Sequence, residues 1–171
     1  MARTDSAHRA LAAQFARRTV EKMYRALVHG NLRNDSGRIA RPIARDPVRR
    51  TRMSVKLGVG RAALTAYRVL ERFEKFTYLE VRIGTGRTHQ IRIHLASEGH
   101  PVAGDRLYGA PAAERLFLHA WRISFTSPVS DQRVTVESPL PEQLSEWLNR
   151  LHTDPSIARR TGGPPHPFGH V

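Results

Sequence analysis

The stretch GTGRTHQIRIHLASEGHPVAGDRLYG, residues 84–109, is the most distinctive part of the sequence, because few core segments carry so many glycines, arginines and histidines. A strand-like run ends at Gly84, and the glycines there let the backbone come close to a neighbouring group. Residues 88–99 then favour a helix, with Thr88 as its cap and Gly99 as its C-terminal stop. The segment therefore predicts a strand, a tight turn and a short helix in succession.

Polar side chains gather where this helix should begin, namely those of Arg87, His89, Gln90 and Arg92. The start of a helix favours anions, so the two arginines are placed to hold a phosphate or a carboxylate. The alternative is that these side chains only cap the helix and pair with surface acids. That alternative explains one arginine more easily than the whole set. The GDRLYG run at 104–109 adds a tight and specific turn.

The rest of the chain reads mostly as strands. Alternating residues such as Tyr24, Ala26 and Val28 indicate a strand over 19–30 that ends at a glycine. Residues 62–73 fit either a strand or a helix. Short strands and turns decorated with arginine are expected within 33–60. Further strands are expected over residues 76–84, 116–128 and 132–139.

Two more helices are expected, one near each end of the chain. The first has Asp5 or Ser6 as its N-cap. Its apolar face consists of Ala7, Leu11 and Phe15. The second covers 140–152, with Pro141 in its first turn. Its inward-facing residues are Leu144, Trp147, Leu148 and Leu151.

This order of elements predicts an α+β fold, in which a few helices cover a mixed, mainly antiparallel sheet. The expected domain covers residues 1–152. The remaining residues, 153–171, are rich in proline and glycine and predict a disordered tail.

The charge of the chain favours nucleic acid as a partner. Lys and Arg number 28 against 15 Asp and Glu, which gives a net charge of +13. Residues 1–60 hold 14 basic and four acidic side chains, so +10 of that excess lies there. Arginine predominates, and its planar group pairs with phosphate through two bonds. The alternative is a solvated surface in an organism that favours arginine codons.

Other classes of site are not supported by the sequence. The chain has no Cys, which excludes disulfides and cysteine zinc sites. His89 and His94 lie five residues apart, which is not the spacing of metal ligands on one helix face, so we expect no metal. GVGRAA at 58–63, with Glu80 at the expected distance, resembles a dinucleotide fingerprint only weakly, because no buried strand precedes it.

Five motifs, in this order along the chain, resemble the RluA/RluD-type pseudouridine synthase family. They are the run over residues 4–30 that ends in KMYRALVHG, GTGRTHQIRIHL at 84–95, HPVAGDRLYG at 100–109, LFLHAWRISFTSPVS at 116–130 and SPLPEQL at 138–144. The resemblance covers nearly 150 residues and implies the C-terminal part of that catalytic domain. It implies isomerisation of uridine in ribosomal or transfer RNA, after the base is flipped into a pocket, with no metal or organic cofactor.

The resemblance also implies roles for individual residues. Tyr24 would stack on the uracil and is a candidate for proton transfer. Arg92, or as second choice Arg87, would pair with the aspartate that begins the reaction. The implied substrate-binding residues are Arg87, Thr88, His89, Gln90 and Ile91, with Ile91 or Ile93 as the floor of the pocket.

The family's nucleophilic aspartate lies in a His-Arg-Leu-Asp segment that precedes the matching part of this chain, and Asp5 matches a different position. We therefore expect the chain alone to be inactive, as a fragment that also lacks the preceding strands and any S4-type RNA-binding domain. Arg92 would then have no carboxylate partner, at a cost of roughly 3–5 kcal/mol. The alternative is a non-catalytic RNA-binding remnant. We expect RNA as partner, no membrane, a cytoplasmic location and a monomer.

Overall fold

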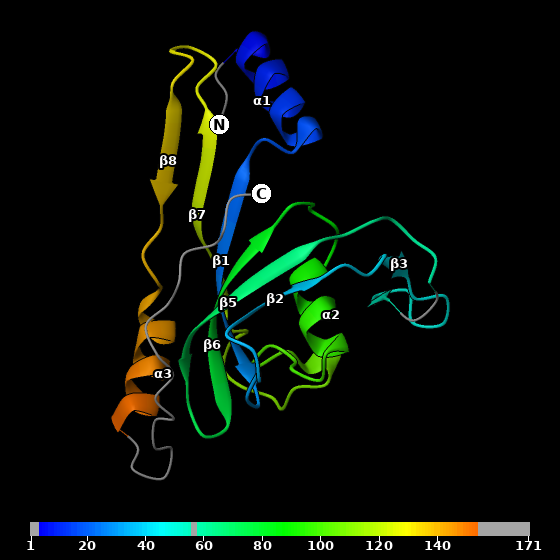
Figure 1. Ribbon diagram of the computed structural model, residues 1–171, viewed down its shortest axis with the longest axis vertical. Helices are drawn as coiled ribbons and strands as arrows, with labels where there is room; N and C mark the ends of the chain where they lie inside the picture. Colours follow the sequence, from blue (N-terminus) through cyan, green and yellow to red (C-terminus); the bar gives the residue numbers. More distant parts are fainter. Residues whose placement is uncertain (1–3, 56–57, 154–171) are drawn as a thin grey trace.

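The computed structural model describes residues 4–55 and 58–153, and its centre is a six-stranded sheet (Figure 1). The strands lie in the order β2-β5-β6-β1-β7-β8, and each neighbouring pair is antiparallel. Their bounds are β1 Glu21–His29, β2 Ser36–Ile39, β5 Thr65–Arg72, β6 Phe76–Ile83, β7 Leu118–Thr126 and β8 Arg133–Glu137. Residues 62–73, whose sequence fits either a strand or a helix, therefore contribute a strand. The predicted α+β fold is confirmed.

Helices and a small hairpin complete the fold. The hairpin pairs β3 (Ala44–Arg45) with β4 (Met53–Ser54). The helices are α1 Asp5–Arg17, α2 Gln90–Ser97, α3 Glu142–Thr153 and the single 3-10 turn η1 Arg106–Tyr108. The predicted tail lies outside the described residues, apart from Thr153 at the end of α3.

Strand β1 is central because its alternate side chains enter two different cores. Ala26 and Val28 are buried on the side of the sheet that carries α2. Leu27 is buried with Phe117 and Leu144 on the side that carries α3. This is the alternation predicted from sequence, and it explains why the strand is apolar on both faces.

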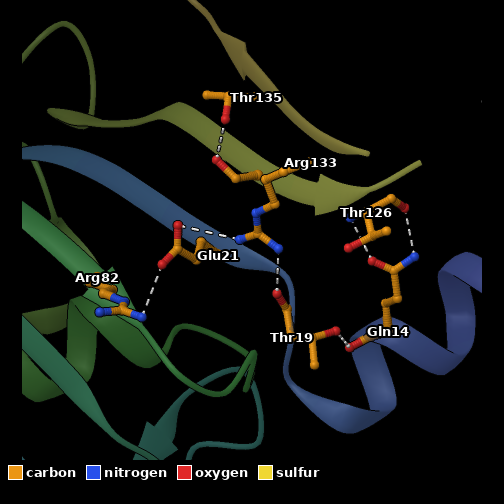
Figure 2. A network of polar contacts seen from close by, with 8 residues as sticks. Gln14, Thr19, Glu21, Arg82, Thr126, Arg133 and Thr135 are labelled. Carbon is orange, nitrogen blue, oxygen red and sulfur yellow. Dashed lines mark hydrogen bonds and ion pairs between the residues drawn. The ribbon is translucent and has the colours of Figure 1, made fainter. Parts of the chain in front are cut away.

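Helix α1 lies at one end of the sheet and buries none of its own residues. Its N-cap is Thr4, whose side chain accepts a hydrogen bond from the Ala7 N–H, and not Asp5 or Ser6 as predicted. Gln14 ties the helix to β7, because its amide exchanges two hydrogen bonds with the backbone of Thr126, at 2.8 and 2.9 Å (Figure 2). Helix α1 is thus held to β7 by polar contacts of Gln14 and buries no residue of its own.

The loop after α2 returns to the sheet through a glycine in the left-handed conformation. Gly104 has φ +79°, and a Cβ at this position would meet the backbone carbonyl of Arg115. Gly99, at the end of α2, has a similar φ of +85°, but open space surrounds it. Both need positive φ, and only Gly104 also needs the absence of a side chain.

The pair of glycines gives a matched test. We expect Gly104→Ala to destabilise the protein by more than Gly99→Ala, for which the left-handed conformation alone costs about 1–2 kcal/mol. The difference reflects the displaced backbone around Arg115 and is measured by urea unfolding of both variants. Equal losses of stability would show that the close approach at Gly104 contributes nothing.

Candidate functional site

The turn between β6 and α2 is fixed by one buried side chain, that of Gln90. Its amide nitrogen donates to the Leu64 carbonyl at 2.9 Å and to the Thr65 hydroxyl oxygen at 3.1 Å. Its amide oxygen accepts from the Thr85 hydroxyl at 2.7 Å and from the Arg87 N–H at 3.1 Å. Because the amide has two donors and two acceptor positions, its hydrogen-bonding capacity is used. Gln90 therefore joins β5, the turn and α2.

His94 extends this connection along α2. It is fully buried, and its Nε2 donates to the Arg41 carbonyl at 3.0 Å. Since a carbonyl can only accept, Nδ1 is the acceptor and receives the Thr65 hydroxyl at 2.9 Å. Burial lowers the pKa of His94, which keeps the ring neutral in this arrangement. His94 is a support for the helix rather than a metal ligand.

Arg92 has a carboxylate partner, contrary to the sequence prediction. Its Nε and Nη2 donate to the two carboxylate oxygens of Asp105, at 2.7 and 2.8 Å. The side chain of Asp105 is fully buried, whereas that of Arg92 keeps 18% of its exposure. The bidentate pair satisfies the buried charge, so the expected cost of an isolated arginine does not arise.

Tyr108 joins this ion pair to the β3–β4 hairpin. Its hydroxyl accepts from the Met53 N–H at 2.9 Å and lies 3.0 Å from Nδ1 of His89. The guanidinium groups of Arg92 and Arg52 lie 5.1 and 5.3 Å from the centre of its ring. No local pattern in the sequence indicates a role for Arg52, Asp105 or Tyr108, although the GDRLYG run predicts a specific turn at the last two.

The remaining residues predicted around the start of α2 are exposed to different degrees. Thr88 is exposed and does not cap the helix, which begins after His89 in a left-handed conformation (φ +54°). Arg87 is half-buried and donates from Nε to the Ala62 carbonyl at 3.3 Å. Ile91 is buried against the sheet, and Ile93 faces the side of the hairpin. The turn thus offers Arg87, Thr88 and His89 to a ligand.

Tyr24 lies on the same side of the sheet as α2, at an irregularity in the pairing of β1 with β7. Burial raises the pKa of its hydroxyl. With Lys22 and Trp121 it lines a mostly apolar cavity of about 320 Å³ next to α1. Burial, and then the charge of Arg18, lower the pKa of Lys22. Tyr24 and Arg92 therefore share one side of the sheet.

The weak dinucleotide pattern has a structural explanation. Gly60 passes close to the backbone of Ile43, and Arg61 pairs with Ile43 in an isolated bridge, so no helix starts there. Glu80 is buried between two arginines, Arg25 at 2.9 Å and Arg68 at 2.8 Å. Its carboxylate is committed to this triad, on the face of the sheet away from α2.

Within residues 4–55 and 58–153, no group of three or more His, Cys, Asp or Glu side chains could hold a metal ion. No helix among these residues is long and apolar enough to cross a membrane.

Comparisons with known sequences all identify the same family. A family described as RNA pseudouridylate synthase matches residues 1–97. A ribosomal large subunit pseudouridine synthase D of Nitrosomonas europaea is 45% identical over 172 residues, which cover 93% of this chain and 49% of that protein. An uncharacterized RNA pseudouridine synthase of Bacillus subtilis is 42% identical over 155 residues, covering 88% of this chain and 50% of the relative.

The solved structures lead to the same fold. Human RNA pseudouridylate synthase domain containing 1 has a TM-score of 0.74 and 27% identity, over 93% of this chain and 67% of that one. Human RNA pseudouridylate synthase domain containing 4, with a TM-score of 0.72 and 21% identity over 87% of this chain and 69% of that one, supports the fold alone. The chain spans about half the length of the curated relatives it matches.

The ion pair of Arg92 and Asp105 predicts a large effect of one small substitution. Asp105→Asn keeps the shape of the side chain but leaves the guanidinium without its charged partner, so we expect a loss on the order of 3 kcal/mol. Glu21→Gln, which weakens the half-exposed pairs with Arg82 and Arg133, should cost less than about 1 kcal/mol. Denaturant unfolding measures both, and equal costs would contradict this assignment.

Three histidines that are buried or partly buried predict the pH dependence of stability. Burial lowers the pKa of His29, His89 and His94 in the folded protein. The unfolded chain therefore takes up protons first, so stability is complete above a pH of about 6.5 and decreases as the pH falls below it.

Urea unfolding at a series of pH values, from neutral downward, measures this decrease in the free energy of unfolding. His94→Gln should make it shallower, whereas His8→Ala on exposed α1 should leave it unchanged. An unchanged slope in His94→Gln would show that His94 does not contribute.

Proposed function

The chain belongs to the RNA pseudouridylate synthase family, and from this premise we propose that it supplies part of the site that isomerises uridine to pseudouridine in ribosomal or transfer RNA. The observation that carries the proposal is the family match together with Arg92, whose orientation Asp105 fixes while donors remain. Two of the five guanidinium N–H groups serve Asp105, so three are left for a second carboxylate.

The reaction defines what the site must do. The bond from N1 of uracil to C1′ of the ribose breaks, and a bond from C5 to C1′ forms. C5 loses its proton and N1 gains one, so no atom and no electron is gained or lost overall. The protein must therefore hold a flipped base, allow it to turn, and accept and return a proton.

Tyr24 is suited to hold the base. It lines an apolar cavity and lies at the irregularity between β1 and β7, where its ring can offer a stacking surface. The raised pKa of its hydroxyl keeps the proton on the oxygen at neutral pH. We assign it stacking first, and proton donation rather than removal.

Arg92 is the positioning residue for the nucleophile in this proposal. An aspartate from another segment would bind the guanidinium donors that Asp105 does not use, which would keep that carboxylate ionised and oriented. Asp105 itself is unsuitable as the nucleophile, because its side chain is fully buried and both of its oxygens bind Arg92. The 171 residues alone should therefore bind RNA without isomerising it.

The turn before α2 provides the remaining contacts. Arg87, Thr88 and His89 are the residues of this turn that an RNA strand can reach. Gln90 and Ile91 act indirectly, since the amide of Gln90 is saturated and Ile91 is buried in the core.

The test uses a fusion protein, here called the restored protein. It joins this chain to the segments of the Nitrosomonas relative that the chain does not match. Loss of tritium from uridine labelled at C5, in transcripts of ribosomal RNA, reports the reaction directly. We expect release from the restored protein and none from the 171-residue chain. Tyr24→Phe should lower turnover by roughly 100-fold, the lower end of the range for acid–base groups.

Tyr78→Phe is the matched control, because Tyr78 packs in the core on the α3 side. It should leave turnover within about twofold, as substitutions away from a site usually do. Release by the 171 residues alone that survives Arg92→Lys would overturn the assignment. A restored, folded protein without activity on any RNA would overturn the proposed reaction.

A further inference from the structure

A second pocket lies between the β3–β4 hairpin and the outer face of α2. Its volume is about 570 Å³, within the about 300–1,000 Å³ that small-molecule sites occupy. Met53, Ile93 and Ala96 give it an apolar part, and Tyr108 also lines it. Its charged lining residues are Arg41, Asp46, Arg49 and Arg52.

The positive charge of this pocket is not neutralised by its own acid. The run from 41 to 52 holds five arginines and a single carboxylate, Asp46. That carboxylate accepts hydrogen bonds from the N–H groups of Val48 and Arg49, both at 2.9 Å, and so closes the hairpin turn. Arg41 is paired with Glu98 on α2 at 2.9 Å. The two remaining arginines, Arg49 and Arg52, share the one carboxylate of Asp46, whose pKa is lowered first by its backbone hydrogen bonds and also by these two charges.

Arg52 is the oriented cation of the pocket. Its guanidinium lies over the ring of Tyr108, 5.3 Å from the ring centre, and its Nε is buried without a hydrogen-bond partner among the described residues. The contact with the ring fixes the direction in which the guanidinium can donate. Arg49, by contrast, is exposed at the rim. Together they present one oriented and one adaptable group of donors.

We propose that this pocket binds a nucleotide of the RNA strand, with its phosphate on Arg49 and Arg52 and its base or ribose over Ile93, Ala96 and Met53. The inference rests on the proposed function for the choice of RNA. Phosphate matches the guanidinium fork, and the apolar part of the pocket suits the rest of a nucleotide.

The position of the pocket supports RNA over a free anion. Tyr108 lines the pocket with Arg52, and its ring contacts the guanidinium groups of both Arg52 and Arg92. A strand that places one nucleotide near Arg92 can therefore continue into the pocket. A second contact of this kind adds affinity and fixes the register of the strand.

The experiment measures binding of a fluorescent single-stranded oligouridine to the 171-residue chain over a series of salt concentrations. We expect Arg49→Gln with Arg52→Gln to weaken binding about tenfold at ~0.1 M salt, and to lower the slope of log affinity against log salt by about one. Arg150→Gln, which removes one charge at an exposed position of α3 away from the hairpin in Figure 1, is the matched control for the single variant Arg49→Gln.

Two further measurements separate the explanations. Arg49→Gln alone tests the pocket without disturbing the contact on Tyr108, should the double variant unfold. Inorganic phosphate at matched ionic strength distinguishes the source of the phosphate. If it leaves RNA binding unchanged relative to chloride, the pocket recognises phosphate within RNA. If it displaces the RNA from the unaltered chain and from Arg49→Gln to the same extent, the RNA does not bind through these arginines and the inference is overturned.

The inference also fails if the chain does not bind RNA, or if Arg49→Gln weakens binding no more than Arg150→Gln. Its failure is distinguishable from failure of the proposed function. If the restored protein releases no tritium while the arginine variants still bind RNA more weakly, the proposed reaction is wrong and the pocket assignment stands. If the restored protein is active and its RNA binding is unchanged by substitution of Arg49 and Arg52, only the pocket assignment is wrong.

Discussion

The saturated amide of Gln90 is the constraint on which the site depends. A buried amide tolerates no change of partner without leaving a donor or acceptor unsatisfied, so it fixes β5, the turn and α2 as one unit. His94 repeats the arrangement one turn further on, through the same Thr65 hydroxyl. The side chains at the start of α2 therefore project from a rigid base, as positioning of a reacting group requires.

The ion pair of Arg92 with Asp105 means that the chain contains no unpaired charge at Arg92. An arginine awaiting an absent carboxylate would be a defect, and a protein containing it would be expected to be poorly stable. Asp105 removes that defect without occupying all the donors. The chain is thus electrostatically self-consistent at Arg92, and the proposed nucleophile would join a guanidinium that is already oriented.

The sequence predicted the fold well where a pattern depended on one element alone. The alternation in β1 and the apolar stripe of α3 report local periodicity, and both are observed. The N-cap at Thr4 was missed by one position, since three successive polar residues could each act as the cap. Contacts between distant segments were not predictable in this way. Asp105 meets Arg92 only because the loop after α2 folds back, and no local spacing reports that.

The arginines show why net charge alone does not define a binding surface. Arg25 and Arg68 share the single carboxylate of Glu80, and Arg92 pairs with Asp105, so two of these three positive charges are balanced inside the protein. An arginine committed to a buried carboxylate contributes little to the field outside the protein. The 41–52 run differs because its one acid is needed to close a turn and lies among five arginines. Charge left over after internal pairing, rather than the total of +13, identifies the surface available to a phosphate backbone.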